Sequence, residues 1–253
     1  MDRLIQHLDA WVTALIFAVA MLAFWSIGWR RGRRSPPEQG EDPGTKFTDA
    51  SMALLGLLLA FTFSMALGRH DQRRQTAVSE SNAIGDFYTC ATLLKEPNRS
   101  RLQEVVREYA RHKLGMARQP RLETERAIRE CQEMHARMTD IAAEAIAGGT
   151  PIVVPLTNTL NNLTSSHAAN IAAYHESLPG IIVVLLLLGS VVPAFLMGLQ
   201  QGASHKAHLA GTFSFILLVT LVIFVTLDLN RPAQGFIRVS QEPLERLIQS
   251  MSK

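Results

Sequence analysis

Four long stretches of the chain contain no Asp, Glu, Lys or Arg. They cover residues 10–29, 50–68, 178–204 and 209–227. Each provides roughly the 20 apolar residues that a helix needs to cross a hydrocarbon core ~30 Å thick. A soluble protein can bury one such helix, but four of them in 253 residues indicate membrane spans. We therefore predict an all-α membrane protein with four transmembrane helices.

The spans form two pairs, separated by a long helical extramembrane insert between the second and third spans. No strand pattern interrupts the insert, and neither proline nor any glycine except Gly85 occurs between Arg69 and Leu94. The second span is therefore expected to continue as one helix over 49–94. The predicted segments are 1–29 (first span with a short N-terminal tail), 30–48 (loop), 49–68 (second span), 69–178 (insert), 179–204 (third span), 205–208 (loop), 209–228 (fourth span) and 229–253 (C-terminal tail).

The second span carries a small residue at every fourth position: Gly56, Ala60, Ser64 and Gly68. Such a row lets another helix approach closely, which is a common mode of packing in membranes. In a ring of identical subunits, the same face could instead line a pore. Phe61 is a candidate apolar constriction, because rings of apolar side chains gate ions by dewetting. Helix packing and pore lining both remain open at this point.

Basic residues follow directly where the second span meets water: Arg69, Arg73 and Arg74. Arginines at the end of a span commonly extend to lipid headgroups. Repeated around an axis, they would instead form a cationic ring that concentrates anions. Asp71 lies three residues before Arg74 and could pair with it, which would weaken that ring.

A charged residue closes the fourth span. Asp228 is followed by Arg231 at the next helical turn and by Pro232, which ends the helix. A charge at this depth needs a partner or a function. We predict a structural clamp between Asp228 and Arg231, with Pro232 and Gly235 in the same tail motif.

The remaining residues match no catalytic, cofactor or metal motif. His205 and His208 share a short loop, and Cys131 and His135 share a helix face, but neither pair has enough further ligands for a metal site. Cys90 and Cys131 could form a disulfide only in an oxidising compartment. The formal net charge of +3 comes largely from arginines beside the spans, so no nucleic-acid surface is indicated. We predict neither an enzyme nor a bound cofactor.

Two segments carry a family resemblance: "LLGLLLAFTFSMALGRHDQRRQTAVSESNAIGDFY" in the second span and "LDLNRPAQGFIRVSQEPLERL" after the fourth. They resemble the bestrophin-like domain family, a prokaryotic group distantly similar to the bestrophin chloride channels. Bestrophins are pentamers whose pore is lined by the second span. Many family members have Asp where this chain has Asn230, so no carboxylate role carries over to that position. An acidic calcium clasp is also missing after the fourth span, so calcium gating does not carry over.

The resemblance implies a homo-oligomeric ion channel, with anions as the expected ions, a pentamer as the expected assembly and membrane lipid as its surroundings. The alternative is a non-conducting membrane scaffold or sensor whose helical insert binds a partner. A prokaryotic plasma membrane is the expected location. Four arginines in 30–34 favour a cytoplasmic position for the loop 30–48 by the positive-inside rule, whereas the resemblance to bestrophins implies the reverse orientation.

Overall fold

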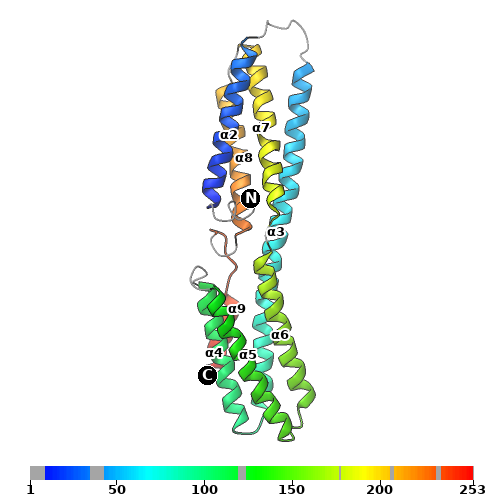
Figure 1. Ribbon diagram of the computed structural model, residues 1–253, viewed down its shortest axis with the longest axis vertical. Coiled ribbons are helices and arrows are strands. Elements are labelled where there is room, and N and C mark those ends of the chain that lie inside the picture. The colour runs from blue at the N-terminus through cyan, green and yellow to red at the C-terminus, as the bar shows by residue number, and fades with distance from the viewer. Residues whose placement is uncertain are drawn as a thin grey trace. The chain divides into compact units, whose positions relative to one another are not determined.

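The computed structural model describes residues 9–34, 43–118, 124–176, 178–205, 208–231 and 235–252. Every regular element in these residues is a helix (Figure 1). The elements are α2 (Ala10–Gly32), α3 (Pro43–Thr92), α4 (Asn98–Arg118), α5 (Thr124–Ala147), α6 (Val153–His175), α7 (Gly180–Ala203), α8 (Leu209–Leu229) and α9 (Glu242–Met251).

Four helical stretches are long and apolar enough to cross a membrane: Ala10–Gly32, Lys46–Thr92, Val153–Ala203 and Leu209–Leu229. This confirms the predicted all-α fold with four candidate membrane-spanning helices, which fit a multi-pass membrane protein. In α3 the charge-free part is 50–68, and in the third stretch it includes all of α7. We expected a continuous helix over 49–94, and α3 extends over Pro43–Thr92.

The described residues divide into two compact units, and each is described by itself. The membrane unit comprises 9–34, 43–68, 178–205, 208–231 and 235–237. The helical unit comprises 69–118, 124–176 and 238–252, and it carries most of the Asp, Glu, Lys and Arg residues.

In the membrane unit, α2 packs along α7 and α8 (Figure 1). Glycines set how closely α2 and α7 approach. A Cβ atom at Gly28 would lie 2.2 Å from the carbonyl oxygen of Phe195, and one at Gly198 would lie 2.1 Å from that of Trp25. Gly32 and Gly202 are equally tight, so each helix presents a GxxxG pair to the backbone of the other. Helix α3 joins this core through Leu55 and Leu59.

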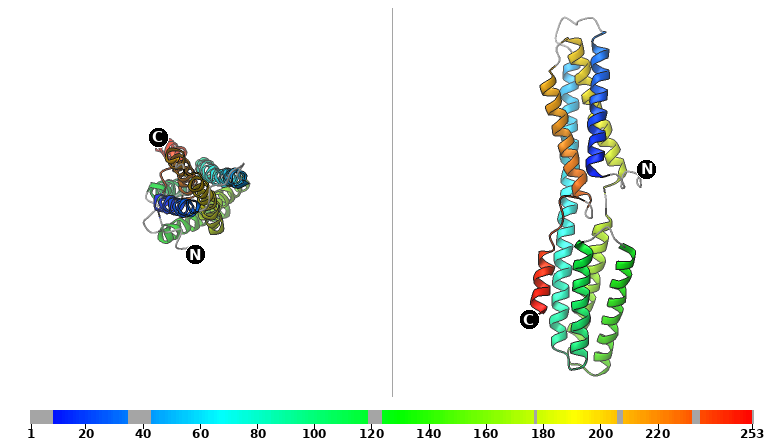
Figure 2. Two further views of the ribbon diagram at one scale, coloured as in Figure 1. Left: turned by 90° about the horizontal axis from the view of Figure 1, so that it is seen from above. Right: turned by 90° about the vertical axis from the view of Figure 1, so that its left-hand side faces the viewer.

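The helical unit consists of the second half of α3 with α4, α5, α6 and α9 (Figure 2). Its core is built from apolar side chains of all five helices, among them Phe87, Leu102, Met138, Leu163 and Leu244.

Helix α9 was not predicted from the sequence. Pro243 lies in its first turn and Leu244, Leu247 and Met251 recur at helical spacing, so the signal was present in the tail.

Candidate functional site

The small-residue row of α3 is exposed in the membrane unit. Gly56, Ala60, Ser64 and Gly68 are all exposed, and no atom lies within 4 Å of a Cβ built at Gly56 or Gly68. The opposite face of the helix is buried through Leu55, Leu59, Thr62 and Ala66. Phe61 is 65% exposed. The row is therefore not used to pack α3 against the described helices of its own chain.

The three arginines after this row have different surroundings. Arg74 is exposed and Arg69 is half-buried, whereas Arg73 is only 1% exposed. The Arg73 guanidinium donates hydrogen bonds to the carbonyl oxygens of Ala173 (3.1 Å) and Glu176 (2.7 Å), at the C-terminal end of α6. Carbonyl groups at the C-terminal end of a helix generally lack intrahelical N–H partners, so Arg73 caps α6. The Arg73 side chain is thus held by backbone acceptors and is almost fully shielded from solvent.

The tail turn of the membrane unit is organised by Asp228, which is buried. Its carboxylate accepts hydrogen bonds from the backbone N–H groups of Phe236 and Ile237, both at 2.9 Å. Gly235 fits because a Cβ there would lie 2.7 Å from the Asp228 carbonyl oxygen. Asp228 thus holds the turn through backbone amides, in addition to lying near the charge of Arg231. Pro232 lies outside the described residues.

Asn230 contributes to the same end of the membrane unit. Its side-chain oxygen accepts a hydrogen bond from the backbone N–H of Leu178 at 2.8 Å, which ties the segment before α7 to the end of α8. An amide oxygen is sufficient for this contact, so a carboxylate at this position is not required.

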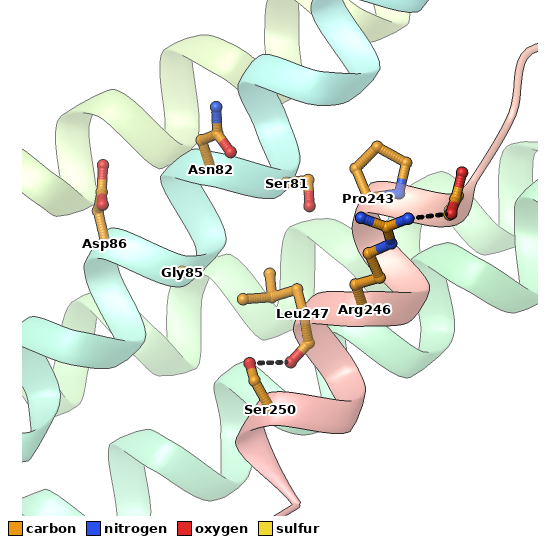
Figure 3. Close-up of a pocket in the computed structure, with 9 residues that line it drawn as sticks. Ser81, Asn82, Gly85, Asp86, Pro243, Arg246, Leu247 and Ser250 are labelled. Atoms are coloured by element: carbon orange, nitrogen blue, oxygen red, sulfur yellow. Dashed lines mark hydrogen bonds and ion pairs between the residues drawn. The ribbon is translucent and has the colours of Figure 1, made fainter.

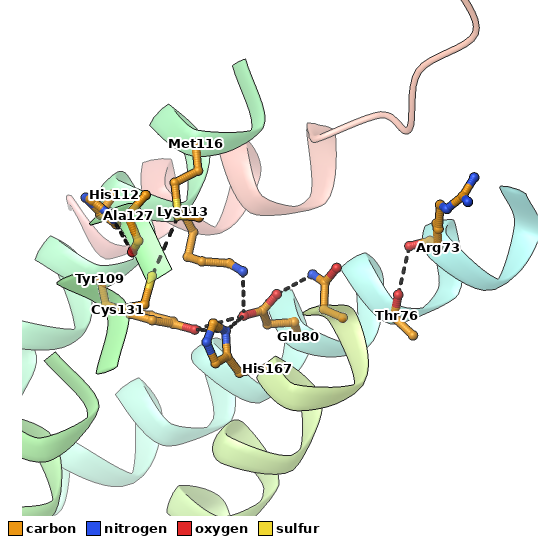
Figure 4. A network of polar contacts seen from close by, with 11 residues as sticks. Arg73, Thr76, Glu80, Tyr109, His112, Lys113, Met116, Ala127, Cys131 and His167 are labelled. Atoms are coloured by element: carbon orange, nitrogen blue, oxygen red, sulfur yellow. Dashed lines mark hydrogen bonds and ion pairs between the residues drawn. The ribbon is translucent and has the colours of Figure 1, made fainter. Parts of the chain in front are cut away.

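The helical unit contains a buried polar network that sequence reasoning missed (Figure 4). Its centre is Glu80 of α3, which is 2% exposed. Oxygen Oε1 lies 2.8 Å from the Tyr109 hydroxyl, 2.9 Å from His167 Nδ1 and 3.0 Å from Lys113 Nζ. Oxygen Oε2 accepts a hydrogen bond from the side-chain amide of Asn170. One carboxylate therefore joins α3 to α4 and α6.

The electrostatics of the network follow from these contacts. Burial works against the charged carboxylate, but the hydrogen bond from His167 and the charge of Lys113 lower the pKa of Glu80 to about 2. Burial and the Glu80 charge raise the pKa of Tyr109, so the phenol stays protonated and donates. The network thus contains an ion pair between the buried Glu80 and Lys113, whose side chain is 13% exposed, and both carboxylate oxygens accept hydrogen bonds.

A second imidazole, that of His135, adjoins this network. The rings of His135 (α5) and His167 (α6) have centroids 5.0 Å apart, and Tyr109 meets His135 edge to face, also at 5.0 Å. Both nitrogens of His135 and Nε2 of His167 are buried without a hydrogen-bond partner in the described residues. No sequence pattern pointed to this site, because its members come from four helices at irregular separations.

The helical unit also has a groove of about 600 Å³ between α3 and α9 (Figure 3). Asn82 and Asp86 line one side, and Arg246 and Ser250 line the other. Leu247 lies over Gly85, with its Cδ1 atom 3.1 Å from a Cβ built there. The sequence "NAIG" (82–85) thus contributes Asn82 and Gly85 to the surface against which α9 lies.

The weak metal candidates gain no further ligands. Among the described residues no group of three or more His, Cys, Asp or Glu side chains could hold a metal ion. Cys90 and Cys131 are both buried and both free thiols. The Cys131 thiol lies 3.7 Å from the Met116 sulfur, and burial raises its pKa to about 11.

Comparisons with curated proteins and with solved structures give no match. A family model described as the Bestrophin-like domain matches residues 14–244, which is most of the chain and includes α3, the Glu80 network and the tail turn. The chain is therefore a member of the Bestrophin-like domain family.

Proposed function

We propose that this protein is a homo-oligomeric ion channel, rather than an enzyme, with the exposed face of α3 lining the path. The observation that carries the proposal is the exposure of Gly56, Ala60, Ser64 and Gly68 on a helix whose opposite face is packed. Small side chains leave room on a shared axis, and family membership supports the comparison with channels lined by the second span. A pentamer is the assembly expected by analogy.

Anions are the expected ions. Just beyond the apolar part of α3, Arg69 and Arg74 outnumber Asp71, which leaves one net positive charge per chain without Arg73. Repeated around an axis, this charge would raise the local concentration of anions. We place the channel in a prokaryotic plasma membrane with the loop 30–48 in the cytoplasm, supported by the arginines of 30–34.

The pore is tested by thiol modification in liposomes or planar bilayers. The Ser64→Cys variant is expected to conduct and to lose its conductance when a charged methanethiosulfonate reagent is added. The matched control is Leu217→Cys on α8, where the side chain is 70% exposed, and modification there should leave conductance unchanged. The native thiols are buried. Absence of ion flux, or equal block in both variants, would count against the proposal.

Reversal potentials measured in a salt gradient test whether the channel conducts anions or cations. Wild-type protein should favour chloride over sodium. Arg74→Gln should shift the reversal potential toward sodium, and Asp71→Asn should shift it toward chloride, because each change alters the local charge by one unit in opposite directions. Shifts of the opposite sign would contradict an anion path at this end of α3.

A non-conducting scaffold or sensor is the second candidate. Leu93 and Val154 are 63% and 68% exposed in the helical unit, and we take these two apolar side chains as candidate contacts for a partner. Substitution of both by Ser should abolish partner capture without affecting conductance. Loss of conductance with this pair would instead connect the helical unit to the ion path.

A further inference from the structure

The histidines His135 and His167 have no role in the ion path that we propose along α3. The two rings lie side by side in the helical unit, with centroids 5.0 Å apart and planes inclined by 33°. His167 is 8% exposed and its Nδ1 lies at Glu80, so in the neutral ring Nε2 carries the lone pair. Three buried ring nitrogens then have no hydrogen-bond partner in the described residues.

The charges around His135 leave no counterion for a proton on its ring. The titratable groups that face it are Glu80 from α3, Tyr109 and Lys113 from α4, and His167 from α6, with Cys131 one turn away on α5. Glu80 is the one carboxylate among these groups, and its oxygens already accept from four donors. A second cation would share the site with Lys113 and leave two N–H groups without acceptors.

We propose that His135 is an acid-responsive site, at which protonation releases α5 from the Glu80 network and opens the helical unit. The neutral ring packs between Tyr109 and His167, whereas the imidazolium reaches water only when α5 moves away. The proposal does not depend on ion conduction by α3.

The pH window follows from the direction of the shift. Burial lowers the pKa of His135 from 6.5 to about 4; the neighbouring His167 acts in the same direction, the Glu80 carboxylate acts against it, and Lys113 lowers it further. A lowered folded-state pKa means that the closed form is fully favoured above pH 6.5 and loses stability as the pH falls toward 4. Glu80 does not contribute in this window, because its lowered pKa places its loss of stability between pH 4.5 and about 2.

The test is hydrogen exchange measured by mass spectrometry on the full chain in lipid nanodiscs, corrected for the intrinsic pH dependence of exchange. Amides of 131–138 in the wild type should lose about fiftyfold in protection between pH 7 and pH 4.5. His135→Gln and His135→Phe remove the titrating group in two ways, one polar and one aromatic, and both should abolish the change. His175→Gln, at an exposed position on α6, is the matched control and should behave as wild type.

Two outcomes would overturn the proposal. The first is wild-type protection over 131–138 that does not change across this pH range. The second is a loss of protection that persists in a folded His135→Gln or His135→Phe variant, since another group would then be responsible.

Discussion

Single glycines decide how the membrane unit packs. The substitution Gly198→Ala tests this packing. The added Cβ would lie 2.1 Å from the carbonyl oxygen of Trp25, a backbone atom that cannot rotate away. We expect a loss of about 3 kcal/mol in the free energy of unfolding, as for severe overpacking. The measurement is thermal unfolding in detergent. Gly211→Ala on α8, with open space around its Cβ, should be nearly neutral. Equal melting temperatures for the two variants would contradict the close approach of α2 and α7.

The sequence identified a small-residue row but not the one that packs within the chain. Gly56 and Gly68 stood out because the row in α3 is longer, yet both have open surroundings in the structure. The closely packed glycines are Gly28 and Gly32 with their partners in α7, which follow the same spacing. Spacing alone predicts a face suited to close approach. It does not say which helix covers that face, because the partner is set by the packing of several spans.

At the scale of elements, a side chain from α3 caps α6. Arg73→Leu would leave the carbonyl oxygens of Ala173 and Glu176 without their donors, and we expect a loss of about 2–4 kcal/mol in stability. Arg74→Leu, one residue on and exposed, should change stability by less than about 0.5 kcal/mol. Limited proteolysis near 170–176 measures the difference. Equal cleavage of the two variants would show that Arg73 is not the cap.

The Glu80 network makes a second prediction at this scale. Glu80→Gln would leave Lys113, whose side chain is only 13% exposed, without its counter-charge, and we expect a loss of about 3 kcal/mol, the low end for a buried pair. The double variant Glu80→Gln with Lys113→Met removes both charges and should recover part of this loss. Asp86→Asn, exposed on the same helix, is the matched control. Denaturant unfolding in detergent provides the comparison, and a double variant that is less stable than Glu80→Gln would refute the ion pair.

The elements themselves were easier to predict than their contacts. Charge-free stretches indicate spans directly, and the absence of prolines after Arg69 indicates the length of α3. The position of Glu80 in a buried network was not predictable in the same way. On α3 it is one of several polar residues, and its partners come from α4 and α6, 29 to 90 positions away in the sequence. Only the arrangement of helices brings these groups together.

At the scale of the whole molecule, the central claim concerns what covers the exposed row of α3. In one chain, Gly56, Ala60, Ser64 and Gly68 face away from every described helix of the membrane unit. A homo-oligomer in which this face turns toward a shared axis explains why small residues occur there, and membership of the Bestrophin-like domain family is consistent with it. If this face of α3 were in contact with lipid instead, large apolar side chains would fit there equally well.

The most direct measurement is a cryo-electron microscopy map of the full chain in lipid nanodiscs. The predicted result is a symmetric oligomer with α3 next to the axis and Ala60 and Ser64 facing an axial opening. A monomer, or an oligomer in which this row faces lipid while another helix lines the axis, would contradict the channel that we propose.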